Sequence, residues 1–515
     1  MESFLKQVAA DLYQRTAGNM GHTAVVFPNK RAGLFFNEYL AQQSDAPLWA
    51  PAYLSISELF RTLSPYQVGD QIKLVCELYK QFSTHTQSQE SLDEFYFWGE
   101  MLLSDFDDAD KNCVDTDRLF SNLQELKGMM DDYDFLDDEK EAAIQQFFQN
   151  FSIEKRTALK EHFISMWDVL GAIYTDFKEA LAQQNIAYEG MLYRQASDVI
   201  QPDELPYDTH VFVGFNVLNQ VELRLFQKLQ AAGKALFYWD YDHFYLTQQK
   251  GHEAGEFLRR NLNEFPNCLP ASFFNNLAHP KVVEYIAAST ENAQARYLPT
   301  WIRQNLTADE KESAIVLCNE TLLQPVLHSL PSEVEQVNVT MGFPLSQTPI
   351  YSFLTAWLDL HIAGYNPQTG RFTYQTVVTL LKHAYTSQLS SHAAPLEQQL
   401  TQKNRFYPLP SELQQDPFLQ LLFTPRMGNL VICQALIEVM QQVATLYQGE
   451  AKTEDTFVQL YQESLFKAYT LVNRFYALIE SGDLTVQPET LRRLLTKVLG
   501  STNIPFHGEP ALGFK

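Results

Sequence analysis

Short apolar runs and long amphipathic patterns alternate along the chain. Residues 58–190 and 350–500 place apolar side chains at helical spacing almost throughout, which predicts two long helical blocks. Fully apolar or β-branched runs predict buried parallel strands, and they lie at residues 24–27, 210–213, 235–238, 282–286 and 314–318. No Gly/Ser-rich or Pro-rich linker separates these parts, so we interpret the helical blocks as insertions into α/β domains.

Composition and charge limit the function classes. The 515 residues correspond to about three to four domains, and 45% apolar residues exclude a disordered or fibrous chain. Acids outnumber bases 62 to 38, for a net charge of −24. Such a surface does not attract nucleic acid as a whole, so a DNA contact must be a local basic groove or be shared with a partner.

Targeting and cysteine patterns indicate a cytoplasmic protein without membrane contact. No unbroken apolar run reaches the ~18 residues that a membrane span needs, and the first residues have no signal-peptide pattern. The five cysteines are far apart and form no CxxC pair, so they predict neither a disulfide framework nor a zinc site.

The motifs of nucleotide hydrolysis are missing. The chain contains no GxxxxGK[ST] phosphate loop, and Gly214 and Phe215 follow the strand predicted at 210–213, where a magnesium-binding acidic pair would be needed. The (D/E)xK triplets that begin at residues 125, 138, 176 and 309 lie in helical or loop contexts, whereas a two-metal nuclease needs one on a strand beside a further Asp.

Other catalytic and metal patterns are also lacking. No HExxH or GxSxG motif occurs. The acidic stretch 104–110 loosely resembles a calcium loop but lacks its glycine. We therefore interpret this stretch and the acids at 131–140 as solvated helix ends. No catalytic site and no metal site is expected within residues 1–515.

Several stretches resemble a known family. HTAVVFPNKRAGLFFNEYL (22–40) has the pattern strand, turn, basic pair, helix, and residues 211–245 have the pattern strand, helix, strand, Asp-containing turn. Together they resemble the first core domain of superfamily 1 helicases of the UvrD type. Within that class the chain is most similar to the AddB/RecC-like helicase–nuclease subunits of bacterial double-strand-break repair, in the Bacteroidetes-type PD-(D/E)XK nuclease family. Further similar stretches lie at 91–112, 251–261, 337–350 and 504–510.

The resemblance implies DNA-binding roles for particular residues. Asn29, Lys30 and Arg31 stand where helicases contact single-stranded DNA, and a basic first turn of a helix favours phosphate; an ordinary basic helix start has the same pattern. Trp239 and Tyr241 stand in a later motif, where aromatic side chains either stack on bases or pack against the edge of the core.

Further residues follow from the same comparison. Thr340 and Gly342 come after a short predicted strand, where a glycine suits either close approach to DNA or a turn that requires it. A degenerate ATP site is implied at Gly214, Phe215, Asp240 and Arg296. In active relatives the region of Arg296 supplies a nucleotide-contacting arginine, and we interpret Arg296 here as structural.

The fold class expected from the resemblance is α/β with large helical insertions. It comprises two RecA-like (P-loop NTPase-like) cores of the superfamily 1 helicase type, each with an inserted helical subdomain. The first core takes residues 1–57 and 195–275 around the insertion 58–194, and the second takes residues 276–350 and 491–515 around the insertion 351–490. Family members continue further, so we expect a truncated product or the N-terminal part of a longer one.

The function implied is that of a non-catalytic, helicase-like DNA-binding scaffold of an AddB-type ATP-dependent exonuclease, acting in homologous recombination and DNA repair. It would guide a DNA strand to a PD-(D/E)XK exodeoxyribonuclease domain beyond this chain. Mg²⁺ is expected only in that domain, and no cofactor is expected here. The implied partners are single-stranded or forked DNA and an active AddA-like helicase–nuclease subunit. The alternative is a protein–protein assembly module for such a helicase, without DNA contact.

Overall fold

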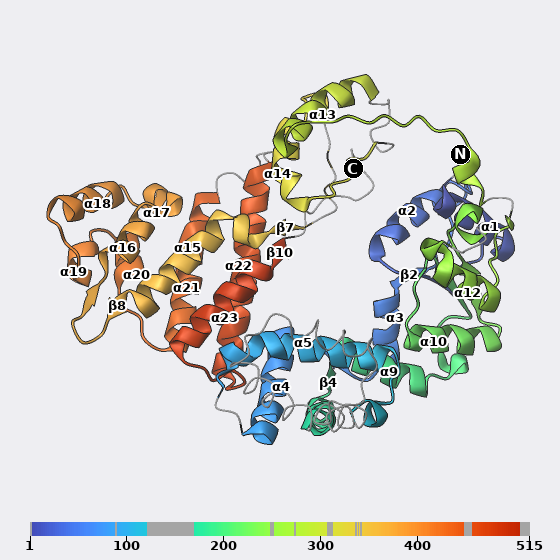
Figure 1. Cartoon of the computed structure of the whole chain (residues 1–515), viewed down its shortest axis with the longest axis horizontal. Helices are drawn as coiled ribbons and strands as arrows, with labels where there is room; N and C mark the ends of the chain where they lie inside the picture. The colour runs from blue at the N-terminus through green and yellow to red at the C-terminus, as the bar shows by residue number, and fades with distance from the viewer. Residues whose placement is uncertain are drawn as a thin grey trace, which may run out of the picture. The chain divides into compact units, whose positions relative to one another are not determined.

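The computed structural model divides the chain into two compact units (Figure 1). Unit 1 comprises residues 1–89 and 98–294, and unit 2 comprises residues 90–97 and 295–515. The structure describes residues 3–87, 90–120, 169–247, 252–271, 274–305, 313–334, 337, 339, 342–447 and 456–504.

The described part of unit 1 combines a four-stranded sheet and a short two-stranded pair with many helices. In chain order its elements are α1 (Phe4–Thr16), β1 (Thr23–Phe27), α2 (Lys30–Ala41), β2 (Ala52–Ser55), α3 (Ile56–Leu63), β3 (Gln67–Val68), α4 (Gln71–Thr86), α5 (Leu92–Lys111, whose first residues belong to unit 2), a helix at 169–183, β4 (Ile186–Ala187), α9 (Glu189–Val199), β5 (Thr209–Val213), α10 (Gln220–Ala231), β6 (Ala235–Tyr238), α11 (His243–Thr247) and α12 (Glu256–Glu264).

Four parallel strands form the sheet in the order β2-β1-β5-β6. Every residue of β1 is buried, as expected for an apolar strand that is covered on both faces. The strands expected at 24–27, 210–213 and 235–238 are confirmed. The edge strand β2 was not expected from the sequence, because three of its four residues are only partly buried and its pattern is mixed.

Helices cover both faces of this sheet. On one face α1 and α2 pack Leu12 and Phe36 into the same hydrophobic core as Val25 of β1. On the other face the ring of Phe226, from α10, lies 3.9 Å from the ring of Phe212 on β5. Each fully buried side chain of this size contributes ~1.5–3 kcal/mol of hydrophobic stabilisation. The well-packed sheet therefore fixes the positions of the residues that follow its strands.

The described chain between β2 and β5 is helical apart from the short parallel pair β3–β4. This confirms the expected helical character of the first block over its described part. The first acidic stretch, 104–110, lies on α5. The acidic stretch 131–140 lies outside the described residues.

Unit 2 is mostly helical over its described residues. In chain order its elements are α13 (Glu291–Asn305, which begins in unit 1), α14 (Leu323–Ser329), β7 (Phe343–Pro344), α15 (Pro349–Leu358), β8 (Tyr365–Asn366), β9 (Arg371–Phe372), α16 (Tyr374–Leu381), α17 (Ala384–Leu389), α18 (Ala393–Gln402), α19 (Pro410–Leu413), α20 (Pro417–Phe423), α21 (Asn429–Ala444), α22 (Thr456–Glu480), α23 (Pro488–Ser501) and β10 (Asn503–Ile504). β7 and β10 form an antiparallel pair, and so do β8 and β9.

Helix α21 and the turn after it are long and apolar enough to cross a membrane by length and composition. The same helix packs along α22 and buries a stripe that includes Ile432, Leu436, Val439 and Val443. Residues at this spacing line one face of a helix. One face of α21 is therefore buried within unit 2, and one such stretch is weak support for a membrane span.

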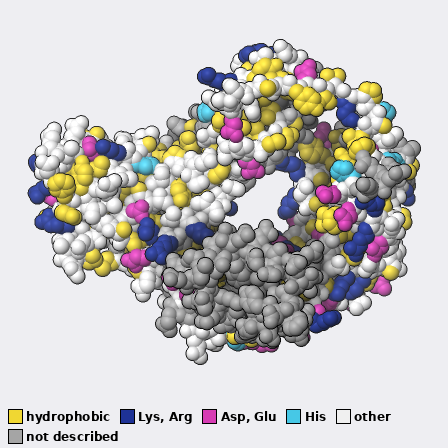
Figure 2. All heavy atoms as spheres, in the orientation of Figure 1, with side chains coloured by type: hydrophobic (Ala, Val, Ile, Leu, Met, Phe, Trp, Pro, Cys, Tyr) yellow, Lys and Arg dark blue, Asp and Glu magenta, His cyan; other side chains and the backbone are white. Residues whose placement is uncertain are grey.

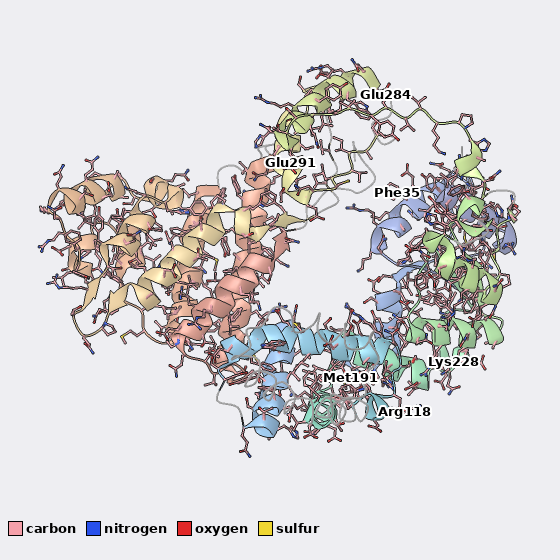
Figure 3. All side chains as sticks on the ribbon, viewed as in Figure 1. Phe35, Arg118, Met191, Lys228, Glu284 and Glu291 are labelled. Carbon is pink, nitrogen blue, oxygen red and sulfur yellow. The ribbon has the colours of Figure 1, made fainter. Side chains whose placement is uncertain are left out.

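Two expected strands do not form within the described chain. Residues 282–286 and 314–318 belong to no strand of the described structure, and Val282, Tyr285 and Val316 are almost fully exposed. Figure 3 labels Glu284 in the first of these stretches, which leads into α13. A β-branched apolar run has strand propensity, but a strand also needs a neighbour to pair with. The described residues thus form a four-stranded parallel sheet with helical insertions in unit 1 and a mostly helical unit 2.

Candidate nucleic-acid interface

Most of the expected unit 1 site residues lie where the sheet strands end. Because all four strands are parallel, their carboxyl ends share one edge, where residues 28–31 follow β1, 214–216 follow β5 and 239–242 follow β6. The chain passes from β1 outward to β2 and from β5 outward to β6, in opposite directions. The edge between β1 and β5 is therefore a topological switch point, the place where open α/β sheets bind ligands.

Asn29, Lys30 and Arg31 form the start of α2 at this switch point. Asn29 Oδ1 accepts a hydrogen bond from the Ala32 amide at 3.2 Å and so caps the helix. Lys30 is exposed and pairs with Glu58, whereas no carboxylate of the described chain pairs with the partly exposed Arg31. The first turn of α2 contains no acid, so the positive end of the helix and the Arg31 charge add together.

The helices after β2 and β5 begin differently. Ser55 and Glu58 form a capping box at α3, and Asn219 and Glu222 form one at α10. In each box the carboxylate accepts the N-cap amide, at 2.9 Å from the Ser55 nitrogen and 3.0 Å from the Asn219 nitrogen. These two helix starts already hold a carboxylate. An incoming anion is therefore favoured at α2 over α3 and α10.

Lys30 and Glu58 form an ion pair at the carboxyl edge of the sheet. The Lys30 ammonium, together with the Ser55 amide, lowers the pKa of Glu58 to about 2. Glu58 thus stays ionised and offsets part of the Lys30 charge. Glu58 was not among the expected site residues, although Ser-x-x-Glu at 55–58 is the signature of a capping box. The pairing of Glu58 with Lys30 depends on the fold.

Gly214 and Phe215 occupy the end of β5. Gly214 has φ +75°, a left-handed conformation that favours glycine, and its amide donates to the Tyr238 carbonyl at 2.9 Å. Phe215 is buried, with its ring 5.5 Å from that of Phe226. This position therefore contributes an apolar side chain to the core. The residues at the end of β5 do not fit a magnesium–nucleotide complex, which needs carboxylate oxygens there.

The aromatic residues after β6 have different exposure. Trp239 is fully buried, and its indole Nε1–H donates to the Phe265 carbonyl at 2.8 Å. Tyr241 is partly buried and stacks on Phe274 with 4.1 Å between ring centroids. Trp239 thus has no free face for a base, and packing against the core is what the structure shows for it. Partial desolvation raises the pKa of the neighbouring Asp240 carboxyl.

The remaining expected residues belong to unit 2. Thr340 lies outside the described residues. A Cβ on Gly342 would lie 2.8 Å from the Asn503 Cβ, so this glycine permits the close approach of the β7 and β10 segments. Arg296 is exposed on α13. Gly342 and Arg296 therefore belong to a different unit from the expected residues at the sheet edge of unit 1.

The described acidic side chains of α5 do not form a cluster that could hold a metal ion. Asp110 is fully buried, and its carboxylate accepts from the Tyr174 and Tyr188 hydroxyls at 2.6 and 2.5 Å. It also contacts Lys178 and Arg194 at 3.0 Å each. Within the described residues no group of three or more His, Cys, Asp or Glu could hold a metal ion. Asp110 is instead the anionic centre of an ion-pair network that joins the helices, so the expectation of a solvated acid is wrong at this position.

No protein-family model matches the chain, and no curated protein matches it either. The observations that bear on function are therefore the sheet edge, its charges and the motifs of the sequence.

Proposed function

We propose that this chain is a non-catalytic DNA-binding scaffold related to the helicase-like part of AddB-type exonucleases. The observation that supports the proposal best is the start of α2, where Asn29, Lys30 and Arg31 lie at the switch point of a parallel sheet. The first turn of α2 has two cations and no acid of its own, and although Glu58 pairs with Lys30, the Arg31 charge and the helix N-terminus favour a phosphate group. The end of β5 has no acids, so phosphate binding there would not be linked to ATP hydrolysis.

The finer parts of the proposal come from the sequence resemblance. They are two RecA-like cores with inserted helical subdomains, an AddA-like helicase–nuclease partner and a PD-(D/E)XK nuclease beyond this chain. In such an assembly the scaffold would hold one DNA strand and direct it to the nuclease during double-strand-break repair. The chain's charge of −24 suits either a confined DNA site or docking on a basic partner.

DNA binding is tested by fluorescence anisotropy with labelled single-stranded and forked DNA at ~50 mM salt, where phosphate contacts are strongest. Arg31→Gln removes a cation that has no ion-pair partner within the described chain, and Lys30→Gln/Arg31→Gln removes both. We expect the double variant to bind about tenfold more weakly or worse, the equivalent of losing a charged hydrogen bond of ~1.5 kcal/mol. The slope of log K against log salt should also fall by ~0.7 for each lost contact to a single strand.

Arg118→Gln is the matched control. Arg118 is exposed in the helical block of unit 1 (Figure 3), so this variant makes the same charge change away from α2. It should bind DNA as the parent chain does. Absence of binding at low salt, or equal affinities of the α2 and Arg118 variants, would refute the DNA-scaffold proposal.

A protein-assembly module is the second candidate, favoured by one observation. Val282, Tyr285 and Val316 expose apolar surface on stretches that pair with no described strand, and exposed apolar segments of this kind accept partner strands. This candidate predicts that charge-reversed Lys30 and Arg31 variants leave assembly with a helicase partner unchanged and that the chain shows no affinity for DNA.

A further inference from the structure

A pocket with a volume of about 720 Å³ lies in unit 2 between the β8–β9 hairpin and the loop that follows α18. Its lining includes Asn366, Arg371, Asn404, Arg405, Phe406 and Tyr407. The volume falls within the ~300–1,000 Å³ range of small-ligand sites. None of these residues belongs to the sheet edge of unit 1.

The loop of this pocket has a fixed backbone. The Phe372 and Tyr374 amides donate to the carbonyls of Pro408 and Phe406 at 3.1 and 2.9 Å. The Arg371 guanidinium donates to the Tyr407 carbonyl at 2.9 Å. These bonds hold residues 406–408 alongside 372–374, so the two aromatic residues stand on a rigid support.

Their side chains nevertheless lie open to solvent. Phe406 is 65% exposed and Tyr407 is 62% exposed. Two adjacent aromatic side chains at this exposure leave a large apolar area in water, at ~25 cal/mol for each Å². A ligand with flat, apolar faces would cover that area and gain the same energy.

Two arginines line the pocket together with the aromatic pair. Arg371 forms no ion pair with any carboxylate of the described chain, and Arg405 pairs with Glu412 at 2.9 Å. Lys403 precedes them in the segment Lys403-Asn404-Arg405-Phe406-Tyr407. In Figure 2 basic and hydrophobic side chains gather together at the end of unit 2 that Figure 1 labels α18, α19 and β8. This local charge contrasts with the net charge of −24 for the chain.

We infer that this pocket binds a short stretch of single-stranded nucleic acid. Exposed aromatic side chains that stack on bases, beside arginines that hold the phosphates, are the chemistry of single-strand recognition. Arg371 and Arg405 would contact phosphate oxygens, and Phe406 and Tyr407 would stack on bases. The inference deepens the proposed function and rests on it for the ligand class, but it uses residues of the other unit.

The test measures the affinity of the whole chain for labelled oligothymidine. Phe406→Leu/Tyr407→Leu keeps apolar bulk at both positions but removes the aromatic faces, so stacking is lost while the loop is retained. We expect affinity to fall about 5-fold or more, since stacking of one base contributes ~1–3 kcal/mol. Tyr407→Phe retains the aromatic face and should bind as the parent does.

Phe466→Leu supplies the matched control, because Phe466 lies on α22 of the same unit and is 63% exposed. It should leave oligothymidine binding unchanged. Parent-like affinity of the double Leu variant would overturn the pocket inference and leave the α2 proposal standing. Loss of affinity in that variant but not in Lys30→Gln/Arg31→Gln would support the pocket and remove the α2 site. Absence of any binding would overturn both and would favour a protein partner for this surface.

Discussion

The buried carboxylate of Asp110 offers the sharpest test of how unit 1 is held together. Asp110 has no solvent exposure and receives contacts from Tyr174, Tyr188, Lys178 and Arg194. These partners come from the helix at 169–183, from α9 and from the residue immediately before α9. One side chain of α5 therefore ties three parts of the helical block to each other.

This geometry predicts how far Asp110→Asn lowers the free energy of unfolding. The substitution keeps the side-chain shape but leaves Lys178 and Arg194 without their buried counter-ion. Breaking a buried pair in this way costs ~3–5 kcal/mol. The Lys178 and Arg194 side chains are 26% and 27% exposed, so water can solvate their charges in part. We therefore expect the free energy of unfolding to fall by ~2–3 kcal/mol. Desolvation already lowers the pKa of Lys178 beside Asp110, which is consistent with a dependence on that carboxylate.

Hydrogen exchange read by mass spectrometry measures the effect locally. Peptides from α5, from the helix at 169–183 and from α9 should lose ~2–3 kcal/mol of protection in Asp110→Asn, while peptides from α21 and α22 keep theirs. Asp108→Asn is the matched control, because Asp108 is exposed on the same helix. Lys178→Met in the Asp110→Asn background should restore part of the protection. Equal protection in the Asp110 and Asp108 variants would refute the role assigned to the network.

Two further predictions concern a buried histidine and a close backbone approach. Burial lowers the pKa of His210 to about 4, and neither ring nitrogen has a described hydrogen-bond partner. In the unfolded chain the pKa of a histidine is ~6.5, so as the pH falls the imidazole is protonated in the unfolded chain before it is protonated in the folded one. The free energy of unfolding of unit 1 should therefore fall between about pH 6.5 and 4. His210→Leu should remove the share of this fall that His210 causes, as measured by urea unfolding at pH 7 and 5. Equal falls in the parent and in the variant would contradict this role of His210. Gly342→Ala places a methyl group 2.8 Å from the Asn503 Cβ and should lower the free energy of unfolding by ~1–3 kcal/mol in thermal unfolding. The control Gly21→Ala, with no atom within 4 Å of its Cβ, should not lower it. A parent-like melting temperature for Gly342→Ala would show that the β7 and β10 segments can move apart without loss of stability.

Local patterns predicted the centre of the sheet but not its whole extent. The runs at 24–27, 210–213 and 235–238 form strands because burial on both faces selects apolar residues at every position. The runs at 282–286 and 314–318 have the same composition but pair with no described strand. Composition reports propensity, whereas pairing depends on which segments the fold brings together.

The candidate site shows the same division. The basic pair Lys30-Arg31 was expected at a helix start, and α2 does begin at Lys30, because a capping Asn before a helical pattern is a local signal. The pairing of Lys30 with Glu58, 28 positions later, depends on the parallel alignment of β1 and β2. The sequence also contained the basic–aromatic segment 403–407, but only the backbone bonds to 372–374 show that its aromatic residues have a rigid support.

An acidic chain can hold a polyanion only with cations that its own acids leave uncompensated. Lys30 is offset by Glu58 and Arg405 by Glu412. Arg31 and Arg371 pair with no carboxylate over the described ranges, and the Arg371 guanidinium donates to the neutral Tyr407 carbonyl. Attraction at long range is therefore weak, and the proposed DNA affinity would have to come from short-range contacts at these two places. Such sites favour a strand that is delivered by a partner over one captured from solution, which agrees with a scaffold that works inside a larger assembly.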